Sequence, residues 1–230
     1  MKNLGILGGM SWESTLEYYR LINQEVHRRL GNLHSAPILM NSVDFAPLAT
    51  LMHNHDWKTI GSILGGHARN LEAAGAQGLI LTTNTMHKVY DRISQDLTIP
   101  FLHIALPVAQ AFRTRDLKTA GLLGTSFTME DGFLRSKLES EGIDVLIPEE
   151  AQRREIHRII FEELVQGILQ KSSREYFRKV IYDLAEKGAQ GIVLGCTEIG
   201  LLVQQEDCPV YMADTTVLHA GAAVDWMLDT

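Results

Sequence analysis

The sequence predicts an α/β protein made of two pseudo-symmetric three-layer α/β/α domains with parallel sheets. Apolar runs of strand length alternate with longer segments of helical apolar spacing along the 230 residues. These runs are continuous rather than alternating, which is typical of parallel strands covered on both faces. One stretch of sequence also occurs twice, as GAQGLILTTNTMHK at 75–88 and as GAQGIVLGCTEIGL at 188–201. Two copies of one α/β unit account for all three observations.

Each predicted strand is a short apolar run bounded by Gly, Pro or polar residues. The runs are 3–8, 36–43, 78–82, 101–105, 118–124, 143–148, 190–195 and 209–213. Pro100 opens the fourth of them. Because strand and helix alternate throughout, we expect parallel sheets with helices on both faces.

The intervals between the strands have the apolar spacing of helices. The predicted helices are 12–30, 57–74, 85–95, a segment after Pro107, 128–141, 150–168, 173–187, 198–204 and 215–228. Several starts carry a side chain that accepts from the first free N–H groups of a helix. We expect Ser11, Asp56 and Asp214 to cap their helices, and Ser172 or Ser173 to cap the helix at 173–187.

The repeat extends beyond its best-matched part. GILGGMS at 5–11 resembles GLLGTSF at 121–127, and IPFLHIA at 99–105 resembles CPVYMAD at 208–214. In the main repeat, Thr83 aligns with Cys196, Asn84 with Thr197 and Thr85 with Glu198. Since the matches occur in the same order, we interpret them as a duplication whose halves are related by an approximate two-fold axis.

Composition excludes several classes of protein. The formal net charge is −7, whereas a nucleic-acid surface needs a basic face. No apolar run approaches the roughly 20 residues of a membrane span. The chain has two cysteines, Cys196 and Cys208, and starts without a leader-like segment, so we expect a cytoplasmic protein with reduced thiols.

Chemically useful residues follow the predicted strands. Ligands of parallel α/β proteins bind at the carboxyl ends of strands, because the loops there converge. The residues at these ends are Met10, Ser11, Thr83, Asn84, Thr85, Thr125, Cys196, Thr197 and Glu198. With the two edges facing each other, Thr83 and Cys196 would address one cleft from opposite sides.

This arrangement suits proton transfer at a carbon acid. One group removes a proton from one face of the α-carbon, and the other delivers a proton to the opposite face. Cys196 follows a strand and precedes a helix, so we expect its thiolate to be favoured. Asn84, Thr85, Thr197 and nearby backbone N–H groups are expected to bind a carboxylate and stabilise the developing enolate.

These motifs resemble the aspartate/glutamate racemase family over essentially the whole chain. The matching residues are Thr83-Asn84-Thr85, where the family has Cys-Asn-Thr, and Gly195-Cys196-Thr197-Glu198, together with LGILGGMSWEST and HSAPILMNSVDF. The resemblance implies an isomerase that racemises a small amino acid by two-base catalysis in the cleft between the domains, without cofactor or metal. It also implies a homodimer and a last helix that packs on the first domain. The expected domains are therefore 1–104 plus 213–230, and 105–212.

The chain departs from the family pattern at three places. Thr83 replaces the first cysteine, and a hydroxyl is a poor base. The resemblance implies that the second-half cysteine handles the L-enantiomer, so we expect Cys196 to act on the L-amino acid and to favour L-to-D conversion. Met52 stands about where aspartate-reading members carry arginine, and Glu155 where they carry lysine. Arg153 and Arg154 are the nearby cations that compensate if the substrate is acidic. Met52 is nonetheless expected to contact the substrate.

Several residues have a structural alternative. Cys196 could be a buried strand-end residue, Thr83 a helix cap, and Glu198 either a solvated carboxylate or the group that meets the substrate ammonium. Cys208 is expected to be structural. His87 follows the TNTM turn by one residue and is expected on a helix surface, with contact to the site as the alternative.

Two negative expectations concern other motifs. Gly8-Gly9 does not fit a dinucleotide motif, and His53-Asn54-His55 lacks the spacing of a metal site.

Three functions therefore remain open beside a strict aspartate or glutamate racemase. They are a broad-specificity amino-acid racemase, a related enzyme such as a maleate isomerase, and a non-catalytic amino-acid-binding protein.

Overall fold

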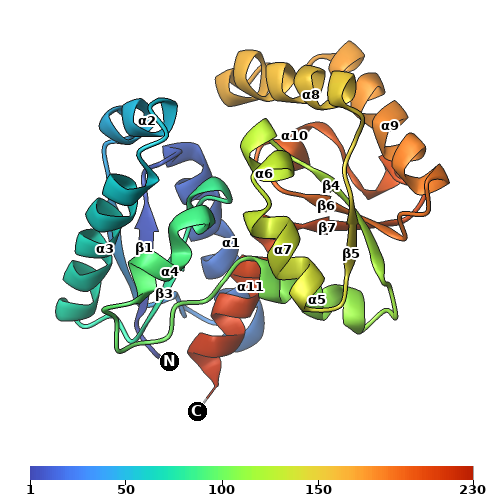
Figure 1. The fold of residues 1–230 in the computed structure, drawn as a ribbon. Helices are drawn as coiled ribbons and strands as arrows, with labels where there is room; N and C mark the ends of the chain where they lie inside the picture. Colours follow the sequence, from blue (N-terminus) through green and yellow to red (C-terminus); the bar gives the residue numbers. More distant parts are fainter. Residues whose placement is uncertain (230) are drawn as a thin grey trace. The chain divides into compact units, whose positions relative to one another are not determined.

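The computed structural model describes residues 1–229, which form two compact units. Unit 1 comprises Met1–Ile104 and the chain from His219 onward, and unit 2 is Ala105–Leu218. Within the described residues, no helix is both long and apolar enough to cross a membrane. Each unit is a parallel sheet flanked by helices, as the sequence predicts (Figure 1).

Unit 1 is built on the three-stranded sheet β2-β1-β3. Its strands are β1 (Leu4–Gly8), β2 (Ile38–Ser42) and β3 (Gly78–Leu81), and its helices are α1 (Trp12–Leu30), α2 (Phe45–His53), α3 (Trp57–Ala73), η1 (Thr85–Val89), α4 (Tyr90–Ser94) and most of α11 (Thr215–Leu228). Helices α1 and α11 pack on one face of the sheet, and α2, α3, η1 and α4 on the other (Figure 1).

Unit 2 has the four-stranded sheet β5-β4-β6-β7. Its strands are β4 (Thr119–Leu123), β5 (Asp144–Leu146), β6 (Gly191–Leu194) and β7 (Tyr211–Asp214), and its helices are α5 (Ala105–Arg113), α6 (Ser126–Glu130), α7 (Phe133–Ser140), α8 (Glu150–Glu162), η2 (Leu164–Gln166), α9 (Lys171–Glu186), α10 (Ile199–Leu202) and η3 (Gln205–Asp207). The order β5-β4-β6 repeats β2-β1-β3, which supports the interpretation of a duplication.

The two sheets differ at one edge. The strand predicted at 101–105 is wrong: this segment joins the sheet only through an isolated parallel bridge between Leu79 and Phe101. The segment leaves the sheet after this bridge and turns into α5 at Ala105. Its counterpart β7 is a full strand, with Val193 opposite Ala213.

The boundary between the units also differs from the expected one. Residues 213–218 were expected in the first domain but group with unit 2. Ala213 and Asp214 belong to β7, and the Thr215 hydroxyl donates to the carbonyl oxygen of Leu194 at 2.8 Å. These contacts hold the start of α11 on unit 2, and the helix reaches the core of unit 1 through Ala220, Ala223 and later residues.

Helix boundaries follow local capping. Helix α1 begins after Ser11, whose side chain accepts from the N–H of Ser14, and ends at Gly31 with φ 68°. Asp56 caps α3, and Asp214 accepts from the N–H of Thr216.

Other helix predictions were wrong in detail. Helix α2 was not predicted, because its short apolar sequence resembles a loop and contains Pro47, which fits only the first turn of a helix. The segment 128–141 is two helices, since Gly132 adopts φ 75°. Helix α9 begins at Lys171 and has no side-chain cap. The Ser173 hydroxyl instead donates to Glu163.

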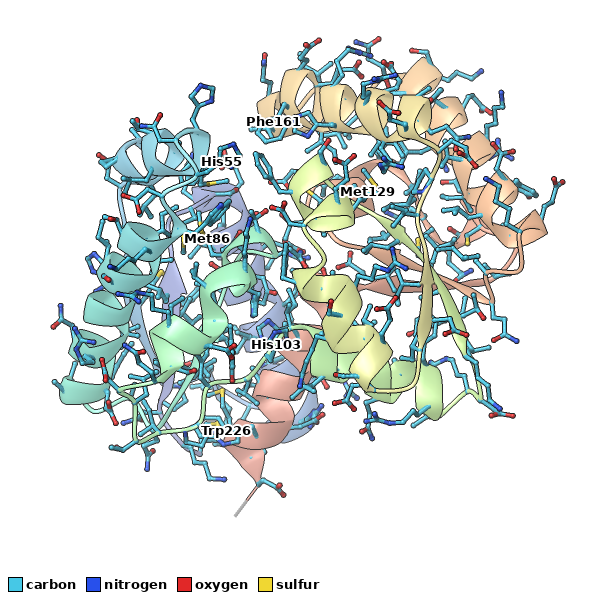
Figure 2. The ribbon with its side chains drawn as sticks, viewed as in Figure 1. His55, Met86, His103, Met129, Phe161 and Trp226 are labelled. Atoms are coloured by element: carbon cyan, nitrogen blue, oxygen red, sulfur yellow. The ribbon has the colours of Figure 1, made fainter. Side chains whose placement is uncertain are left out.

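Helix α11 lies very close to the sheet of unit 1. A Cβ atom at Gly78 would lie 2.5 Å from the ring of Trp226, which is labelled in Figure 2. A side chain at this position of β3 would therefore push the helix away from the core.

We expect Gly78→Ala to lower the free energy of unfolding by roughly 1–3 kcal/mol, the usual cost of overpacking. Gly66→Ala is the matched control, because its Cβ would meet only the far end of Arg69 at 3.9 Å. On helix α3, that change should raise stability by up to about 1 kcal/mol. Urea unfolding of both variants measures the difference, and equal stabilities would contradict the close approach of α11.

Candidate active site

In unit 1, the turn after β1 is closely packed. Gly9 has φ 90°, and a Cβ there would lie 2.3 Å from the carbonyl oxygen of Val43. The Met10 side chain is buried in the core, and the Ser11 hydroxyl caps α1. Both side chains therefore have structural roles in this turn, and their contact with a substrate stays a prediction.

Two threonines that the sequence did not single out as ligand-binding residues support this turn. The Thr15 hydroxyl accepts from the N–H of Gly9 at 2.9 Å and lies 2.9 Å from the carbonyl oxygen of Ser11. It also lies 3.0 Å from the Thr82 hydroxyl. The pair links the ends of β1 and β3, so the turns after these strands are held together. In the sequence, the position of Thr82 directly before Thr83 could have indicated this role.

The turn after β3 carries the predicted residues Thr83, Asn84 and Thr85. Thr83 and Thr85 are half-buried, and Asn84 is buried. Asn84 occupies the cap position of η1, and its side chain does not cap the helix. The interpretation of Thr83 as the helix cap is therefore wrong.

His87 is buried, so its prediction as a surface residue is wrong. The ring turns inward, with Nδ1 2.8 Å from the carbonyl oxygen of Thr83. A 3₁₀ turn at this point, instead of the expected α-helix, brings the ring under the Thr83 turn.

Met52 lies on α2, a helix that the sequence pattern did not predict. Its side chain is half-buried and packs against the apolar cluster formed by α2, α3 and β3. Neighbouring His53 ends α2, and His55 follows with φ 55°. Met52 brings an apolar group to this part of unit 1.

In unit 2, the turn after β4 contains the predicted residue Thr125. Thr125 is buried and caps α6, with its hydroxyl 3.4 Å from the N–H of Thr128. The next N–H, of Ser126, donates to Nδ1 of His157 at 3.2 Å. His157 on α8 was missed by sequence reasoning, because nothing in its helix sequence places it beside this turn.

The turn after β6 brings three predicted residues together. The Cys196 thiol donates to Glu198 Oε2 at 2.9 Å, and the Thr197 hydroxyl donates to the same oxygen at 2.7 Å. Cys196 keeps some exposed surface, whereas Cys208 is buried. One carboxylate oxygen thus receives both the candidate catalytic thiol and the neighbouring hydroxyl.

The thiol is not activated by a helix N-terminus, so that expectation is wrong. Burial of the sulfur raises the pKa of Cys196 well above its ordinary value, and the charge of Glu198, its hydrogen bond and the charge of Asp214 raise it further. The hydrogen bond from the backbone N–H of Glu198 acts in the other direction. Helix α10 has only four residues, and its contribution is outweighed. The resting site holds a neutral thiol beside a carboxylate.

Asp214 was predicted only as a helix cap. It caps α11 through its Oδ1, and its Oδ2 lies where a Cβ at Gly200 would be 2.5 Å away. It therefore faces the segment that follows Cys196. The position of Asp214 at the carboxyl end of a predicted strand could have indicated that it lies near the Cys196 turn.

The cations of α8 are engaged by carboxylates. Arg153 Nε lies 2.7 Å from Glu130 Oε1, and Arg154 Nη1 lies 2.7 Å from Glu150 Oε1. Glu155 pairs with Arg158 at 2.8 Å. Neither Arg153 nor Arg154 is thus an uncommitted partner for an acidic substrate side chain.

These features define a two-unit α/β protein with structurally equivalent turns at the carboxyl ends of β3 and β6. The family model for Asp/Glu/hydantoin racemases matches residues 7–223. The chain belongs to this family, and the membership identifies it as an isomerase of the amino-acid racemase class.

Individual relatives agree with this assignment. The structure of a candidate Asp/Glu racemase from Yersinia pestis is 48% identical and covers 100% of both chains, with a TM-score of 0.96. An aspartate racemase homologue from Pyrococcus horikoshii is 31% identical over 100% of both chains, with a TM-score of 0.87. A broad-specificity amino-acid racemase from Bacillus subtilis is 23% identical over 98% of each chain.

We expect Glu198→Gln to lower the pKa of Cys196, because it removes the negative charge that faces the thiol. In a Cys208→Ala background, iodoacetamide should then alkylate Cys196 several-fold faster at pH 8, with the reaction followed by mass spectrometry.

Thr197→Val is the matched control for this change. It removes the other hydrogen bond to Glu198 but leaves the carboxylate charge beside the thiol. Its alkylation rate should stay near that of the parent. An unchanged rate in Glu198→Gln would show that the carboxylate does not hold the thiol in its protonated form.

Proposed function

We propose that the protein racemises amino acids without a cofactor, with Cys196 and Thr83 acting on opposite faces of the α-carbon. The observation that carries this proposal is the Cys196 thiol donating to Glu198 at the carboxyl end of β6. Thr83 occupies the equivalent position after β3. The reaction requires both groups to reach one substrate molecule.

The proton path from an L-amino acid begins at the thiol. Cys196 transfers its proton to Glu198, and the thiolate sulfur then removes the α-proton, leaving its electron pair on the substrate as an enolate. Thr83, or a water that it holds, donates a proton to the opposite face of the carbon. The proton on Glu198 then passes through solvent to the oxygen of Thr83, or of its water, which had donated a proton to the carbon. The net change is inversion at the α-carbon.

The charge that develops on the substrate carboxylate needs donors. Asn84, Thr85 and Thr197 are the side chains of the two turns that we assign to this carboxylate, together with backbone N–H groups of the turns after β1 and β4. Such donors stabilise an enolate most where water is excluded. A substrate ammonium near Glu198 would offset the charge that raises the pKa of Cys196, so binding itself would help to form the thiolate.

The replacement of a cysteine by Thr83 makes the two faces unequal. L- and D-amino acids have the same free energy, so the equilibrium constant of racemisation is one and kcat/KM must be equal in both directions. The asymmetry must therefore appear in kcat, in KM and in solvent exchange. A thiol can exchange its proton with water and return it to the L-face, whereas delivery from a hydroxyl is slow.

In D2O, recovered L-substrate should gain α-deuterium faster than D-product appears. NMR follows the deuterium, and chiral chromatography follows the enantiomers. Thr83→Cys should raise the inversion rate by roughly 10²-fold, the usual contribution of a well-matched acid or base, and bring inversion close to exchange.

The cysteines provide the control for this experiment. Cys196→Ala should abolish both exchange and inversion, whereas Cys208→Ala should leave both within about twofold. A ligand-induced rise in thermal stability with no exchange from any amino acid would identify a binding protein instead. An unaltered inversion rate in Thr83→Cys would exclude Thr83 from the second face.

The substrate range that we propose is broad and includes neutral side chains. Met52 is apolar, and Arg153 and Arg154 are paired with Glu130 and Glu150. An acidic side chain would meet repulsion from the net charge of −7 without a dedicated cation in these places. The similar protein from Bacillus subtilis is described as a broad-specificity amino-acid racemase.

Met52→Arg should shift selectivity toward acidic substrates. A new charge-assisted hydrogen bond contributes about 1.5–3 kcal/mol, so the ratio of kcat/KM for aspartate or glutamate to that for a neutral amino acid should rise roughly tenfold or more. Met52→Gln has a similar length without the charge and should change the ratio little. Equal ratios in the two variants would place residue 52 away from the substrate side chain.

A further inference from the structure

Three histidines form a buried cluster in unit 1. His87 is on η1, His103 precedes α5 and His219 is on α11, and their exposed fractions are 3%, 8% and 0%. The ring centroids of His87 and His103 are 4.9 Å apart, and those of His87 and His219 are 5.9 Å apart. The proposed proton path uses none of them, so the cluster needs an explanation of its own.

The hydrogen bonds of His87 fix its tautomer. Nδ1 lies 2.8 Å from the carbonyl oxygen of Thr83, and a carbonyl can only accept, so Nδ1 carries the hydrogen. Nε2 must then accept, which it does from the N–H of Ile104 at 3.3 Å. The ring is neutral and joins the Thr83 turn to the backbone at Ile104.

His219 has the opposite tautomer for the same reason. Nε2 lies 3.1 Å from the carbonyl oxygen of Leu102 and so carries the hydrogen. Nδ1 accepts from the Tyr18 hydroxyl at 3.0 Å. Both nitrogens of each ring are used, and each ring satisfies its partners only while it is neutral.

The cluster lies where the chain passes between the units. Ile104 is the last residue of unit 1 before unit 2 begins, and His219 is the first after the chain returns. His219 holds the backbone at Leu102, and His87 holds it at Ile104. The first crossing is thus fastened to unit 1 at two points, and one of these also holds the Thr83 turn.

We propose that His87 is a positioning residue, whose neutral ring is anchored at the first chain crossing and, by donating from Nδ1 to the Thr83 carbonyl oxygen, sets where the Thr83 hydroxyl delivers its proton. The proposal deepens the proposed function and rests on it for the role of Thr83. The ring acts through the backbone of the turn. Its loss should therefore affect inversion and leave exchange at the Cys196 face intact.

Protonation of His87 would break its hydrogen bond with Ile104. A proton on Nε2 of His87 would face the N–H of Ile104, donor against donor. The titratable groups that face His87 are His103, His219 and Tyr90, which stacks on it, with Tyr18 behind His219.

The surroundings keep these rings neutral. Burial lowers the pKa of His87 well below its ordinary value, and the charges of His103 and His219 lower it further. Burial also lowers the pKa of His219 to about 4. Because both values fall below that of an unfolded histidine, the unfolded chain binds more protons in acid. The contribution of these neutral rings to the free energy of unfolding should therefore be complete above about pH 6.5 and be lost as the pH falls toward 4.

The tautomers can be tested on the unmodified full-length chain. Side-chain ¹⁵N NMR at pH 7 should show hydrogen on Nδ1 of His87 and on Nε2 of His219. Both rings should remain neutral down to pH 5. Hydrogen on Nε2 of His87, or protonation of its ring near pH 6, would overturn the proposal. This measurement needs no enzymatic activity, so it decides the tie even if the proposed function fails.

Two substitutions then separate the two bonds of His87. In His87→Asn, the side-chain amide lies near the position of Nδ1 and can still donate to the Thr83 carbonyl oxygen. In His87→Gln, the longer side chain brings its amide to the position of Nε2, where its oxygen can accept from the N–H of Ile104. We expect His87→Asn to keep the ratio of inversion to exchange within about threefold. We expect His87→Gln to lower the ratio at least tenfold.

Tyr18→Phe is the control, because it removes a bond to His219 and leaves His87 untouched. It should lower the Tm without changing the ratio of inversion to exchange. If the ratio is unchanged in both His87 variants, falls equally in both, or falls in Tyr18→Phe as well, His87 is a structural residue only. Absence of exchange in the unmodified protein would refute the proposed function, and the NMR result would still decide the tie.

Discussion

Parallel pairing of a central strand with the strand before each candidate catalytic turn is the constraint on which the rest of the structure depends. Leu7 pairs with Leu81 in unit 1, and Leu123 pairs with Leu194 in unit 2. Because the strands run the same way, two turns emerge at one edge in each unit. The small residues that open these turns let their backbones come close together. Each unit thereby carries one of the two turns to which we assign a catalytic role.

The two halves are chemically different although their scaffolds match. In unit 2, burial and the Glu198 carboxylate raise the pKa of the Cys196 thiol. In the mechanism that we propose, its activation therefore depends on a partner that takes the proton and on a substrate that supplies positive charge. In unit 1, a hydroxyl stands at the equivalent place, and a neutral histidine holds its backbone. Duplication thus supplied the geometry, and later divergence set the acid–base character of each half.

Much of the fold was predictable because it is encoded locally. Helix α1 was predicted with its observed ends, since Ser11 and the apolar spacing act within a few residues. The segment 101–105 was predicted as a strand and is only a bridge, because pairing partners are set by the rest of the sheet. Helix α2 was missed for a related reason: its apolar residues pack on a surface that exists only in the folded unit.

The sequence by itself determined the duplicated α/β architecture, the family and the positions of Thr83, Cys196 and Glu198 at strand ends, because these follow from patterns within the chain. Only the tertiary structure decided the state of the groups. The neutral thiol of Cys196 depends on burial, whereas the inward-facing ring of His87 and the pairing of Arg153 with Glu130 depend on residues distant in sequence. Protonation is set by the local dielectric and by nearby charges, and neither exists until the chain has folded.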